Sequence, residues 1–504
     1  MKILIHGFFF VALSTMQVMA QPSWQSRYIK QNGKGQLIYT ADSLGNTIPD
    51  FSRVGYQQGQ TKPPAVTVVK TVFPNSGNDQ QAIQTAIDAV AAMPMDKNGF
   101  RGAVLVKAGT YKIPGTLRIG ASGIVLRGEG PATILVATGK GQRKLIVAGG
   151  TGELKEIAGT RRRIDQTYVP VGTFSFNVAS TQGLKIGDSI IVYRPATKKW
   201  IEDIQMDRIE RRDSTSRQWD PAEYGLHYER VITGISKNRI TIDNPIVMVM
   251  EEQYGGGEIY QYSFDGRIWN VGVEQLTCES EYSGDEDEDH GWDAIFFNRL
   301  VNGWVANVTA KYFGYSCVNL GYQARNVTVF NCSYLSPKSK ITGSRRYSFN
   351  NDGQLNLVGD CFASEGRHDY VTGARVCGPN VFYNCKSVMA KADIGPHHRW
   401  ASGTLFDNII TDGEINVQDR GNWGTGHGWA GVTQVIWNCT VSRAAIQNPW
   451  TSGKNYVIGL SGASYDGRLK GRPVAIWEGT NQPGLTPASL YIAQLQEAIK
   501  KKKP

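Results

Sequence analysis

Apolar residues in the second half of the chain recur in short runs, several of which end at a cysteine. Cys332, Cys361, Cys385 and Cys439 each close such a run, and the first three are 29 and 24 residues apart. A related apolar run at 404–410 lies in the longer gap before the fourth. A unit of 24 to 30 residues built from strands and Gly- or Asn-rich turns cannot bury its own apolar face, so successive units must stack. The pattern predicts a β-solenoid.

Two residue types mark equivalent points of this repeat. Asn331, Asn384 and Asn438 each precede the closing cysteine, and we expect them to form an asparagine ladder at a turn between coils. The chain has 7 cysteines, and we expect most of them to be small buried apolar residues. Because the number is odd, at least one thiol has no intramolecular partner.

The first coils are expected upstream. Asn78-Asp79 can cap a helix whose apolar residues from Ala82 to Val90 follow helical spacing and would cover the first coil. Strands are expected at 103–107, 116–119 and 123–127, separated by Gly-containing turns. The capping helix is followed by Val-Lys-Ala-Gly-Thr-Tyr at 106–111 and Leu-Arg-Gly-Glu-Gly at 126–130.

These motifs resemble the opening of right-handed parallel β-helix proteins of the pectate-lyase-like group, over about 66–136 and 266–460. The resemblance implies an all-β chain folded as a right-handed parallel β-helix. The group contains pectate lyases, alginate lyases and chondroitinase B-like enzymes, several of which use calcium with Lys and Arg as base and acid. That pattern has no match in this sequence. The group also contains hydrolases, epimerases and phage tail proteins, so the fold does not decide the function.

The remaining segments are assigned as follows. Residues 1–20 have a positive start, an apolar run and a small-residue cleavage site, which predicts a signal peptide and a periplasmic or secreted protein. An N-terminal extension is expected at 21–65, the start of the β-helix at 66–141, a β-rich insertion of antiparallel strands at 142–261 and the main coils at 262–486. Residues 487–504 are expected to form a helix that caps the last coil and a basic tail.

Composition narrows the class of protein. The hydrophobic fraction of 41% and the charged fraction of 19% exclude a disordered chain, and 57 glycines favour many turns. The net charge of +10 falls to +5 without Lys2 and the tail lysines 500–503, so the basic balance is modest. We expect a monomer that binds an acidic polysaccharide, with no nucleic acid partner and no membrane span.

Candidate chemistry lies where polar residues are too dense for a solenoid wall. Arg346, Arg367, His398 and Arg420 are separated by 21, 31 and 22 residues, about one coil each. Stacked coils would bring them into one groove that suits an anionic polymer. The candidates for substrate binding are Arg345, Arg346, Arg420, His427, His290, Trp400, Trp423 and Trp429.

The reaction that suits these residues is β-elimination of a uronate polymer. It needs a cation for the carboxylate, a base for the C5 proton and an acid for the leaving oxygen. We assign Arg367 and Arg399 to the carboxylate or a sulfate, His398 or His397 to the base, and His368 with Tyr370 to the acid or base partner. In a regular strand His397 and His398 would face opposite sides, but Pro396 makes a loop plausible, and the choice stays open.

Two alternatives remain. One is a β-helix glycoside hydrolase with an acid pair from Glu365, Asp369, Asp393 and Asp419. The other is a polysaccharide-binding protein without catalysis. No metal ligand is assigned. The acidic run 285–289 could bind calcium, although a solvated loop is favoured.

Overall fold

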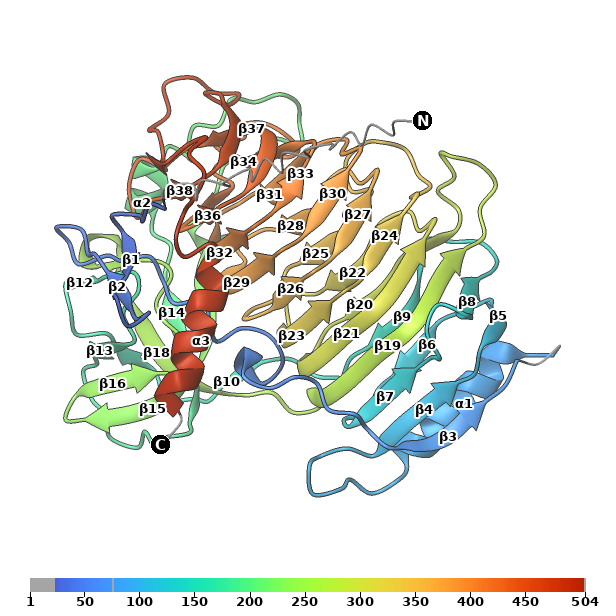
Figure 1. The fold of residues 1–504 in the computed structure, drawn as a ribbon. Helices are drawn as coiled ribbons and strands as arrows, with labels where there is room; N and C mark the ends of the chain where they lie inside the picture. The colour runs from blue at the N-terminus through green and yellow to red at the C-terminus, as the bar shows by residue number, and fades with distance from the viewer. Residues whose placement is uncertain (1–22, 75–76, 503–504) are drawn as a thin grey trace, which may run out of the picture.

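A computed structural model of the protein describes residues 23–74 and 77–502, so the predicted signal peptide lies outside the described residues. Most of the strands belong to one sheet of 29 strands, in which every pairing is parallel. Figure 1 shows this sheet wound into a long coil. The predicted right-handed parallel β-helix is confirmed.

Each full coil contributes three strands, which stack into three faces. The first face contains β3(Val68–Val72), β4(Gly102–Val106), β7(Ile124–Arg127), β19(Ile268–Ser280), β21(Leu300–Lys311), β23(Ala324–Phe330), β26(Leu357–Gly359), β29(Cys377–Tyr383), β32(Ala401–Asp407), β36(Val435–Trp437), β38(Tyr456–Ile458) and β40(Ile476–Glu478), and β35(Gly431–Val432) also pairs with β32. The second contains β5(Gly109–Ile113), β8(Thr133–Ala137), the ends of β19 and β21, β24(Ser333–Leu335), β27(Phe362–Ser364), β30(Lys386–Val388), β33(Ile410–Thr411), β37(Thr440–Ile446) and β39(Ser461–Ser464). The third contains β6(Leu117–Ile119), β9(Arg143–Ala148), β20(Gly291–Phe297), β22(Ser316–Leu320), β25(Phe349–Asn351), β28(Tyr370–Thr372), β31(Asp393–Pro396) and β34(Glu414–Val417).

The register of the first face reproduces the predicted period. Leu357 pairs with Val381, Val381 with Leu405, and Leu405 with Val435. The interior is filled by stacked side chains such as Phe382 and Phe406, whose ring centroids are 5.3 Å apart. All seven cysteines are free and buried, as expected of small apolar residues. Each coil therefore buries its apolar side against the next coil.

The asparagine ladder is also present. The Asn331 amide donates to Asn307 at 2.6 Å, the Asn438 amide donates to Asn408 at 3.1 Å, and Asn384 donates to Asp360. All six ladder residues have φ between 48° and 56°, a left-handed conformation that asparagine tolerates better than most residues. The ladder lies at the turn between the first and second faces. Its left-handed backbone and its side-chain hydrogen bonds explain why the repeat keeps Asn or Asp at this position.

Helix α1(Asp79–Ala91) covers the open end of the first coil, as predicted. The Asn78 side chain accepts from the Gln81 amide at 3.0 Å, which caps the helix. Ile83, Ile87 and Val90 are buried in the same core as the coil interior. The two motifs that carry the family resemblance meet here, because the Glu129 carboxylate accepts from the Ala108 amide and pairs with Lys107 on the neighbouring coil.

The C-terminal helix α3(Leu490–Lys502) is confirmed, but it does not lie over the end of the last coil. It packs on the outer side of the first face, where Leu490 and Tyr491 contact the outward-facing Leu405 and Val435. The Asp407 carboxylate accepts from the Tyr491 amide at 2.7 Å and fixes the start of the helix. Figure 1 shows this helix crossing the strands on that side. The N-terminal extension, with the hairpin β1(Ile29–Gln31) and β2(Leu37–Tyr39) and the 3-10 turn η1(Tyr56–Gly59), packs beside it.

The insertion is antiparallel, as predicted, but it begins later than expected. Residues 143–148 form β9, which pairs in parallel with β6 and β20, so they belong to the coil. The insertion contains β10(Lys155–Glu156), β11(Arg162–Arg163), β12(Tyr168–Val169), β13(Ser175–Asn177), β14(Ser189–Arg194), α2(Lys198–Asp203), η2(Pro221–Glu223), β15(Leu226–Ser236), β16(Arg239–Ile242), β17(Met250–Glu251), η3(Glu252–Tyr254) and β18(Glu258–Ser263).

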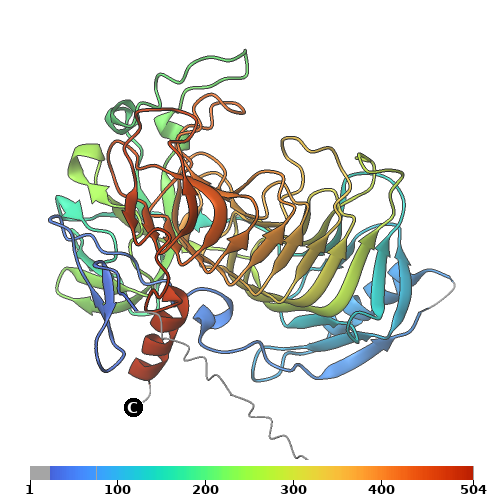
Figure 2. The ribbon, with the colours of Figure 1, turned by 45° about the horizontal axis from the view of Figure 1, so that its top comes forward.

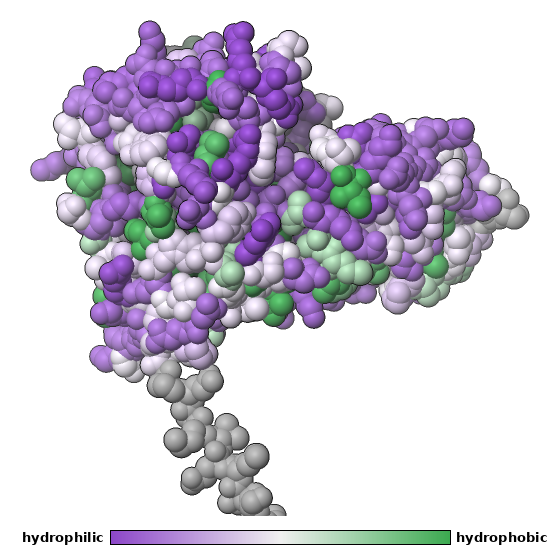
Figure 3. Space-filling view, turned by 90° about the horizontal axis from the view of Figure 1, so that it is seen from above, coloured by the Kyte–Doolittle hydropathy of each residue, from purple (hydrophilic) through white to green (hydrophobic). Residues whose placement is uncertain are grey.

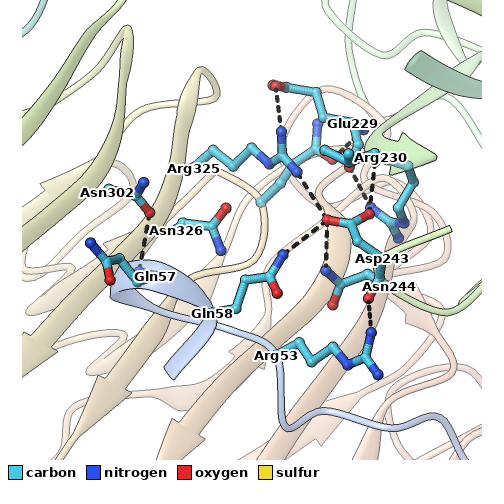
Figure 4. Close-up of polar contacts among 12 residues, drawn as sticks. Arg53, Gln57, Gln58, Glu229, Arg230, Asp243, Asn244, Asn302, Arg325 and Asn326 are labelled. Atoms are coloured by element: carbon cyan, nitrogen blue, oxygen red, sulfur yellow. Dashed lines mark hydrogen bonds and ion pairs between the residues drawn. The ribbon is translucent and has the colours of Figure 1, made fainter. Parts of the chain in front are cut away.

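Buried charges fasten the insertion to the coil. Figure 4 shows the Asp243 carboxylate facing Arg325 of β23 at 3.3 Å and the Gln58 amide at 3.1 Å. Glu229 accepts from Arg267 at 2.5 Å and lies 3.7 Å from Arg325. Apolar contacts add to this network, since Trp200 and Trp219 of the insertion share a core with residues of the last coils. The insertion is thus held rigidly beside the turns that follow the third face.

Candidate active groove

A groove of about 1240 Å³ runs across the third face, over residues on either side of β31 and β34 and the turn that precedes β28. Loops at 342–347 and 423–427 border it, and Arg212 reaches it from the insertion. Figure 2 shows the green loop of the insertion beside the orange and red loops of the last coils. Figure 3 views the molecule from this upper side, where hydrophilic side chains predominate. Seven of the predicted site residues line the groove: Arg367, His397, His398, Arg399, Arg420, Trp423 and His427.

Four imidazoles form one cluster at the groove. The ring centroids of His368 and His397 are 4.5 Å apart, those of His397 and His398 are 5.2 Å apart, and those of His398 and His427 are 4.8 Å apart. Tyr347 lies against the cluster, with its ring centroid 4.8 Å from His368 and 5.4 Å from His397. His368 lies beneath the surface and the other three reach the groove.

The histidines are held neutral. Burial lowers the pKa of His368 to about 4 and that of His427 to about 3. Burial also lowers the pKa of His397 and His398, and neighbouring imidazoles and guanidinium groups add to the effect. A neutral imidazole keeps a free lone pair on one ring nitrogen, the atom that a general base uses.

Asp393 anchors the centre of the groove. Its carboxylate pairs with Arg420, and its backbone oxygen lies 2.7 Å from His368 Nδ1, which therefore donates to it. Desolvation raises the pKa of Asp393, but the charge of Arg420, its hydrogen bond and smaller contributions together hold that pKa below its usual value. Because His368 donates from Nδ1, its Nε2 is the acceptor nitrogen of the neutral ring.

The groove carries more positive than negative charge. Six cationic side chains line it, against the two carboxylates of Asp393 and Glu414. Both carboxylates are paired, Asp393 with Arg420 and Glu414 with Arg443 at 2.6 Å. Among the described residues no carboxylate lies within 4.0 Å of Arg367, Lys391 or Arg399. These three cations are available to an anionic ligand.

Several buried nitrogen atoms at the groove have no hydrogen-bond partner in the described part of the chain. They are His397 Nδ1, His398 Nδ1, His427 Nδ1, His368 Nε2, Arg367 Nη1 and Arg420 Nε. Buried polar groups in native proteins are nearly always satisfied, and the exceptions concentrate where a ligand binds. The clustering of these atoms at one groove indicates a binding site for a polar molecule.

Both histidines of the 397–398 pair line the groove, which answers the question that strand alternation left open. Strand β31 ends at Pro396, and the chain then turns through left-handed conformations at Arg399 (φ 55°) and Trp400 (φ 64°). Alternation of faces does not apply to such a turn. Consecutive histidines can therefore face the same space.

Three residues that were predicted to act on or contact the substrate do not line the groove: Tyr370, Trp400 and Trp429. Tyr370 is buried in the coil interior and donates to the backbone oxygens of Cys361 and Lys386, so it cannot reach a substrate. Trp400 and Trp429 are buried under the insertion, and the Trp429 indole donates to the Ile204 backbone oxygen at 2.9 Å. The insertion covers both indoles, and this contact has no signature in the sequence.

Three further candidates also lie outside the groove. Arg345 forms a two-point pair with Glu288, and Arg346 is buried with its guanidinium on Ser339. His290 is buried between the Ser280 hydroxyl at 2.9 Å and the Lys338 backbone oxygen at 2.8 Å. All three hold the loops that border the groove at its far end and are corrected to structural roles.

The structure adds residues that the sequence reasoning did not select. Tyr347, Lys391 and Tyr315 line the groove, as does Arg443. Tyr347 directly follows the Arg345-Arg346 pair, and Lys391 pairs through its backbone with Gly366 on the previous coil. Counting one coil from Arg367 along the register of β28 and β31, in which Thr372 opposes Pro396, leads to Lys391.

The carboxylates proposed for a hydrolase are mostly absent from the groove. Asp369 is buried beside Ser348, and burial raises its pKa to about 6. Asp419 is buried and paired with Arg472 at 2.8 Å, and Glu365 is not among the lining residues. Of the four candidates only Asp393 borders the groove.

Three of the five acids in the run 285–289 pair with neighbouring cations. Asp285 pairs with Lys338 at 2.7 Å, Glu288 with Arg345 at 2.6 Å and Asp289 with Lys140 at 3.8 Å. Among the described residues, no group of three or more His, Cys, Asp and Glu side chains is arranged to hold a metal ion. In residues 23–74 and 77–502, no helix is long and apolar enough to cross a membrane.

The chain matches no protein-family model and no curated protein. Among solved structures it is similar to the tailspike protein gp49 from Pseudomonas phage LKA1, with 14% identity over 80% of this chain and 71% of the other, and a TM-score of 0.37. It is similar to an alginate lyase from Paenibacillus sp. str. FPU-7, with 10% identity over 82% of this chain and 100% of the other, and a TM-score of 0.36. The tailspike of E. coli bacteriophage HK620, solved with a pentasaccharide, gives 11% identity over 88% of this chain and a TM-score of 0.43. This chain spans 61% of that tailspike. The fold assignment rests on the strand pairing itself.

Proposed function

We propose that the chain is an exported polysaccharide lyase that cleaves a uronate-containing polymer by β-elimination in this groove. One observation carries the proposal: neutral imidazoles with unpartnered nitrogens lie beside guanidinium groups that have no carboxylate partner among the described residues. A base and a carboxylate-binding cation are the two groups that removal of the C5 proton requires. Pectin, alginate and glycosaminoglycan-like polymers are the substrate class.

Arg367 and Arg399 bind the uronate carboxylate. A guanidinium can donate two parallel hydrogen bonds to a carboxylate, which fixes the sugar and spreads the charge that develops on the carboxylate side of C5. Arg367 lines the groove, and its Nη1 is buried with no hydrogen-bond partner among the described residues. The binding of the carboxylate thereby acidifies the C5 proton.

His398 removes that proton, with His397 as the alternative base on the same turn. Each has an Nδ1 with no hydrogen-bond partner in the described part of the chain, and burial lowers the pKa of each ring, so the ring is neutral when the substrate arrives. The C5–H electron pair forms the C4–C5 double bond, and the C4–O4 bond breaks. The proton resides on the imidazole after this step.

Tyr347 protonates the leaving O4 oxygen, which is the role earlier assigned to Tyr370. Burial raises the pKa of Tyr347 above its ordinary value, so the phenol is protonated near neutral pH. The charge of Arg367 opposes this effect and eases loss of the proton when the bond breaks. The histidinium then returns a proton to the tyrosinate through solvent, and the products are an unsaturated uronate and a new hydroxyl end.

A hydrolase is the second candidate, because one register places two carboxylates side by side. Asp393 opposes Glu414 on the adjacent strand, and neighbouring parallel strands lie about 4.8 Å apart. Both are ion-paired, and Arg420 holds the pKa of Asp393 low, whereas a hydrolase needs one carboxylic acid with a raised pKa. These charges favour the lyase. A third possibility is a protein that binds the polymer without cleaving it. Such a protein would give the cluster of four neutral imidazoles no role.

One assay separates the three. The purified protein is incubated with pectin, alginate, chondroitin sulfate and hyaluronan, and ultraviolet absorbance of the unsaturated product is read beside new reducing ends. A lyase gives both signals, a hydrolase gives ends alone, and a binder gives neither. His398→Ala and Arg399→Ala should abolish turnover without unfolding the protein, and full activity in both would move the active site elsewhere.

A further inference from the structure

A second cavity of about 540 Å³ opens beside the groove. Its walls come from the insertion, through Arg217, Trp219 and Tyr224, and from the coil turns that carry Arg375 and Arg399. Arg399 and Thr425 line both cavities, so these two residues lie at the boundary between this side pocket and the groove.

Two arginines of adjacent coils face the side pocket. The Arg375 amide donates to the Arg399 backbone oxygen at 2.8 Å, and both residues adopt φ of 55°. Equivalent turn positions one coil apart project in the same direction, so the two positive charges are neighbours. Among the described residues neither has a carboxylate within 4.0 Å, although Glu223 lies on the exposed wall of the pocket. Unbalanced neighbouring cations favour a bound anion.

The floor of the pocket is rigid and aromatic. Trp219 stacks on Tyr224 with ring centroids 4.2 Å apart, and its indole donates to the Gly426 backbone oxygen at 3.3 Å. The Arg375 guanidinium lies 5.3 Å from the centre of the Tyr224 ring. Both arginines act electrostatically on the Tyr224 hydroxyl, which places their charges near it. An aromatic floor with cations at its edge suits a charged sugar ring.

Polar contacts join the two residues at this boundary. Arg399 Nη2 donates to the Thr425 hydroxyl, and the Thr425 backbone oxygen accepts from the Arg217 amide at 3.1 Å. The Arg399 side chain also hydrogen-bonds the Tyr224 hydroxyl, so the insertion and the 423–427 loop both hold its guanidinium at the boundary between the two cavities. A chain lying in the groove passes this contact on its way to the pocket.

We propose that the side pocket binds a second anionic substituent, a carboxylate or a sulfate ester, on a sugar next to the one cleaved. This inference rests on the proposed function, since it places a further subsite on the same chain. Arg375 binds the second anion, and Arg399 bridges the two subsites. The protein therefore selects polymers that carry charge on neighbouring sugars and acts best on oligomers long enough to fill both cavities.

The test compares Arg375→Ala with wild type on oligomers of the polymer that wild type degrades. KM for tetrasaccharides and longer chains should rise about 10-fold in the variant, with kcat changed little, because a contact made equally in ground and transition states affects KM. The shortest oligomer that is cleaved should show no such change. Arg375→Lys should recover part of the affinity. Arg118→Ala is the matched control, since Arg118 is an exposed arginine on β6 at the other end of the coil.

A binding arm works without turnover. Sulfate should raise the unfolding temperature of wild type and Arg118→Ala more than that of Arg375→Ala, whichever reaction the groove performs. Equal KM values for Arg375→Ala and wild type at every oligomer length, or equal sulfate shifts, would overturn the side pocket and leave the lyase intact. A different outcome would be new reducing ends without unsaturated product, together with a KM effect of Arg375→Ala that depends on oligomer length. This result would overturn the lyase and retain the side pocket. A uniform fall in kcat at all lengths, with unchanged circular dichroism, would also contradict a subsite role.

Discussion

The Asp393 carboxylate on β31 binds the Arg420 guanidinium, which follows β34 one coil further along. The same aspartate holds His368 through its backbone oxygen. Both side chains of the pair are buried. Asp393 thus positions a cation through its carboxylate and an imidazole through its backbone oxygen in the centre of the groove.

Asp393→Ala should therefore reduce both stability and activity. Removing one partner of a buried pair leaves the other charge unpaired, which costs about 3 to 5 kcal/mol. Displacement of the groove side chains should lower kcat/KM by about 100-fold or more. Urea unfolding and ultraviolet product assays measure the two effects. Glu252→Gln, which removes an exposed pair with Arg163, is the control and should change neither by more than about 1 kcal/mol or a few-fold in rate. Wild-type stability in Asp393→Ala would contradict the anchoring role.

The imidazole cluster predicts how stability depends on pH. Burial lowers the pKa of His427 to about 3 in the folded protein, against an ordinary value of 6.5. Below pH 6.5 the unfolded chain therefore binds a proton that the folded chain refuses, and stability falls as the pH falls toward 3.

His427→Gln should remove this contribution. Between pH 6.5 and 4, the free energy of unfolding should fall less steeply in the variant than in wild type, by up to about 1.4 kcal/mol per pH unit. Other buried groups, such as Asp369 with its pKa raised to about 6, affect both proteins alike. Urea unfolding at half-unit pH steps gives the two slopes, and parallel curves would show that His427 is not buried as a neutral ring.

Much of the fold could be predicted because the solenoid repeats a local pattern. The spacing of Cys332, Cys361 and Cys385 gives the number of residues in one coil directly, since these thiols occupy equivalent interior positions. The ladder of Asn331, Asn384 and Asn438 does the same for a turn. The start of the insertion was harder to predict from the sequence, because β9 differs little in composition from the antiparallel strands that follow it.

The sequence predicts a groove residue correctly only where the coil spacing alone determines its position. Arg367, His398 and Arg420 meet as expected because each lies in a turn beside a third-face strand, Arg367 before β28, His398 after β31 and Arg420 after β34. Tyr370 failed because 365–369 is a turn that begins with a left-handed Glu365, after which the tyrosine enters the interior. Trp400 failed because a distant segment covers it, and contacts between an insertion and its host leave no periodic signal.

Tyr347→Phe tests the acid role. The change removes one hydroxyl and keeps the ring that packs on His368 and His397, so the unfolding temperature should stay within a few degrees. Loss of a general acid should lower kcat by about 100-fold or more with little change in KM. Tyr322→Phe, at an exposed position outside the groove, should behave as wild type. A kcat within about two-fold of wild type in Tyr347→Phe would assign the proton donor to another group.

The buried network of Figure 4 predicts that the insertion depends on Asp243. Its carboxylate accepts from Arg325, Gln58 and the Val231 amide at 2.8 Å. Asp243→Ala should lower the free energy of unfolding by about 3 kcal/mol or more, because Arg325 keeps its charge in a buried site. Asp207→Asn, in an exposed pair with Arg208, is the control. Guanidinium unfolding followed by tryptophan fluorescence reports the loss, and equal midpoints in the two variants would show that the network is not needed to hold the insertion.

Trp423 and Trp450 allow a matched test of sugar stacking. The exposed fraction is 38% for Trp423 and 39% for Trp450, and each indole has an arginine over it. Only Trp423 lines the groove, whereas Trp450 lines a separate cavity. Trp423→Ala should raise KM for the polymer by about 10-fold, the equivalent of about 1.4 kcal/mol of lost contact, with a small change in kcat. Trp450→Ala loses a comparable surface contact and should leave KM unchanged. If both substitutions raise KM equally, the effect comes from general loosening of the last coils, and the groove does not use Trp423 as a platform.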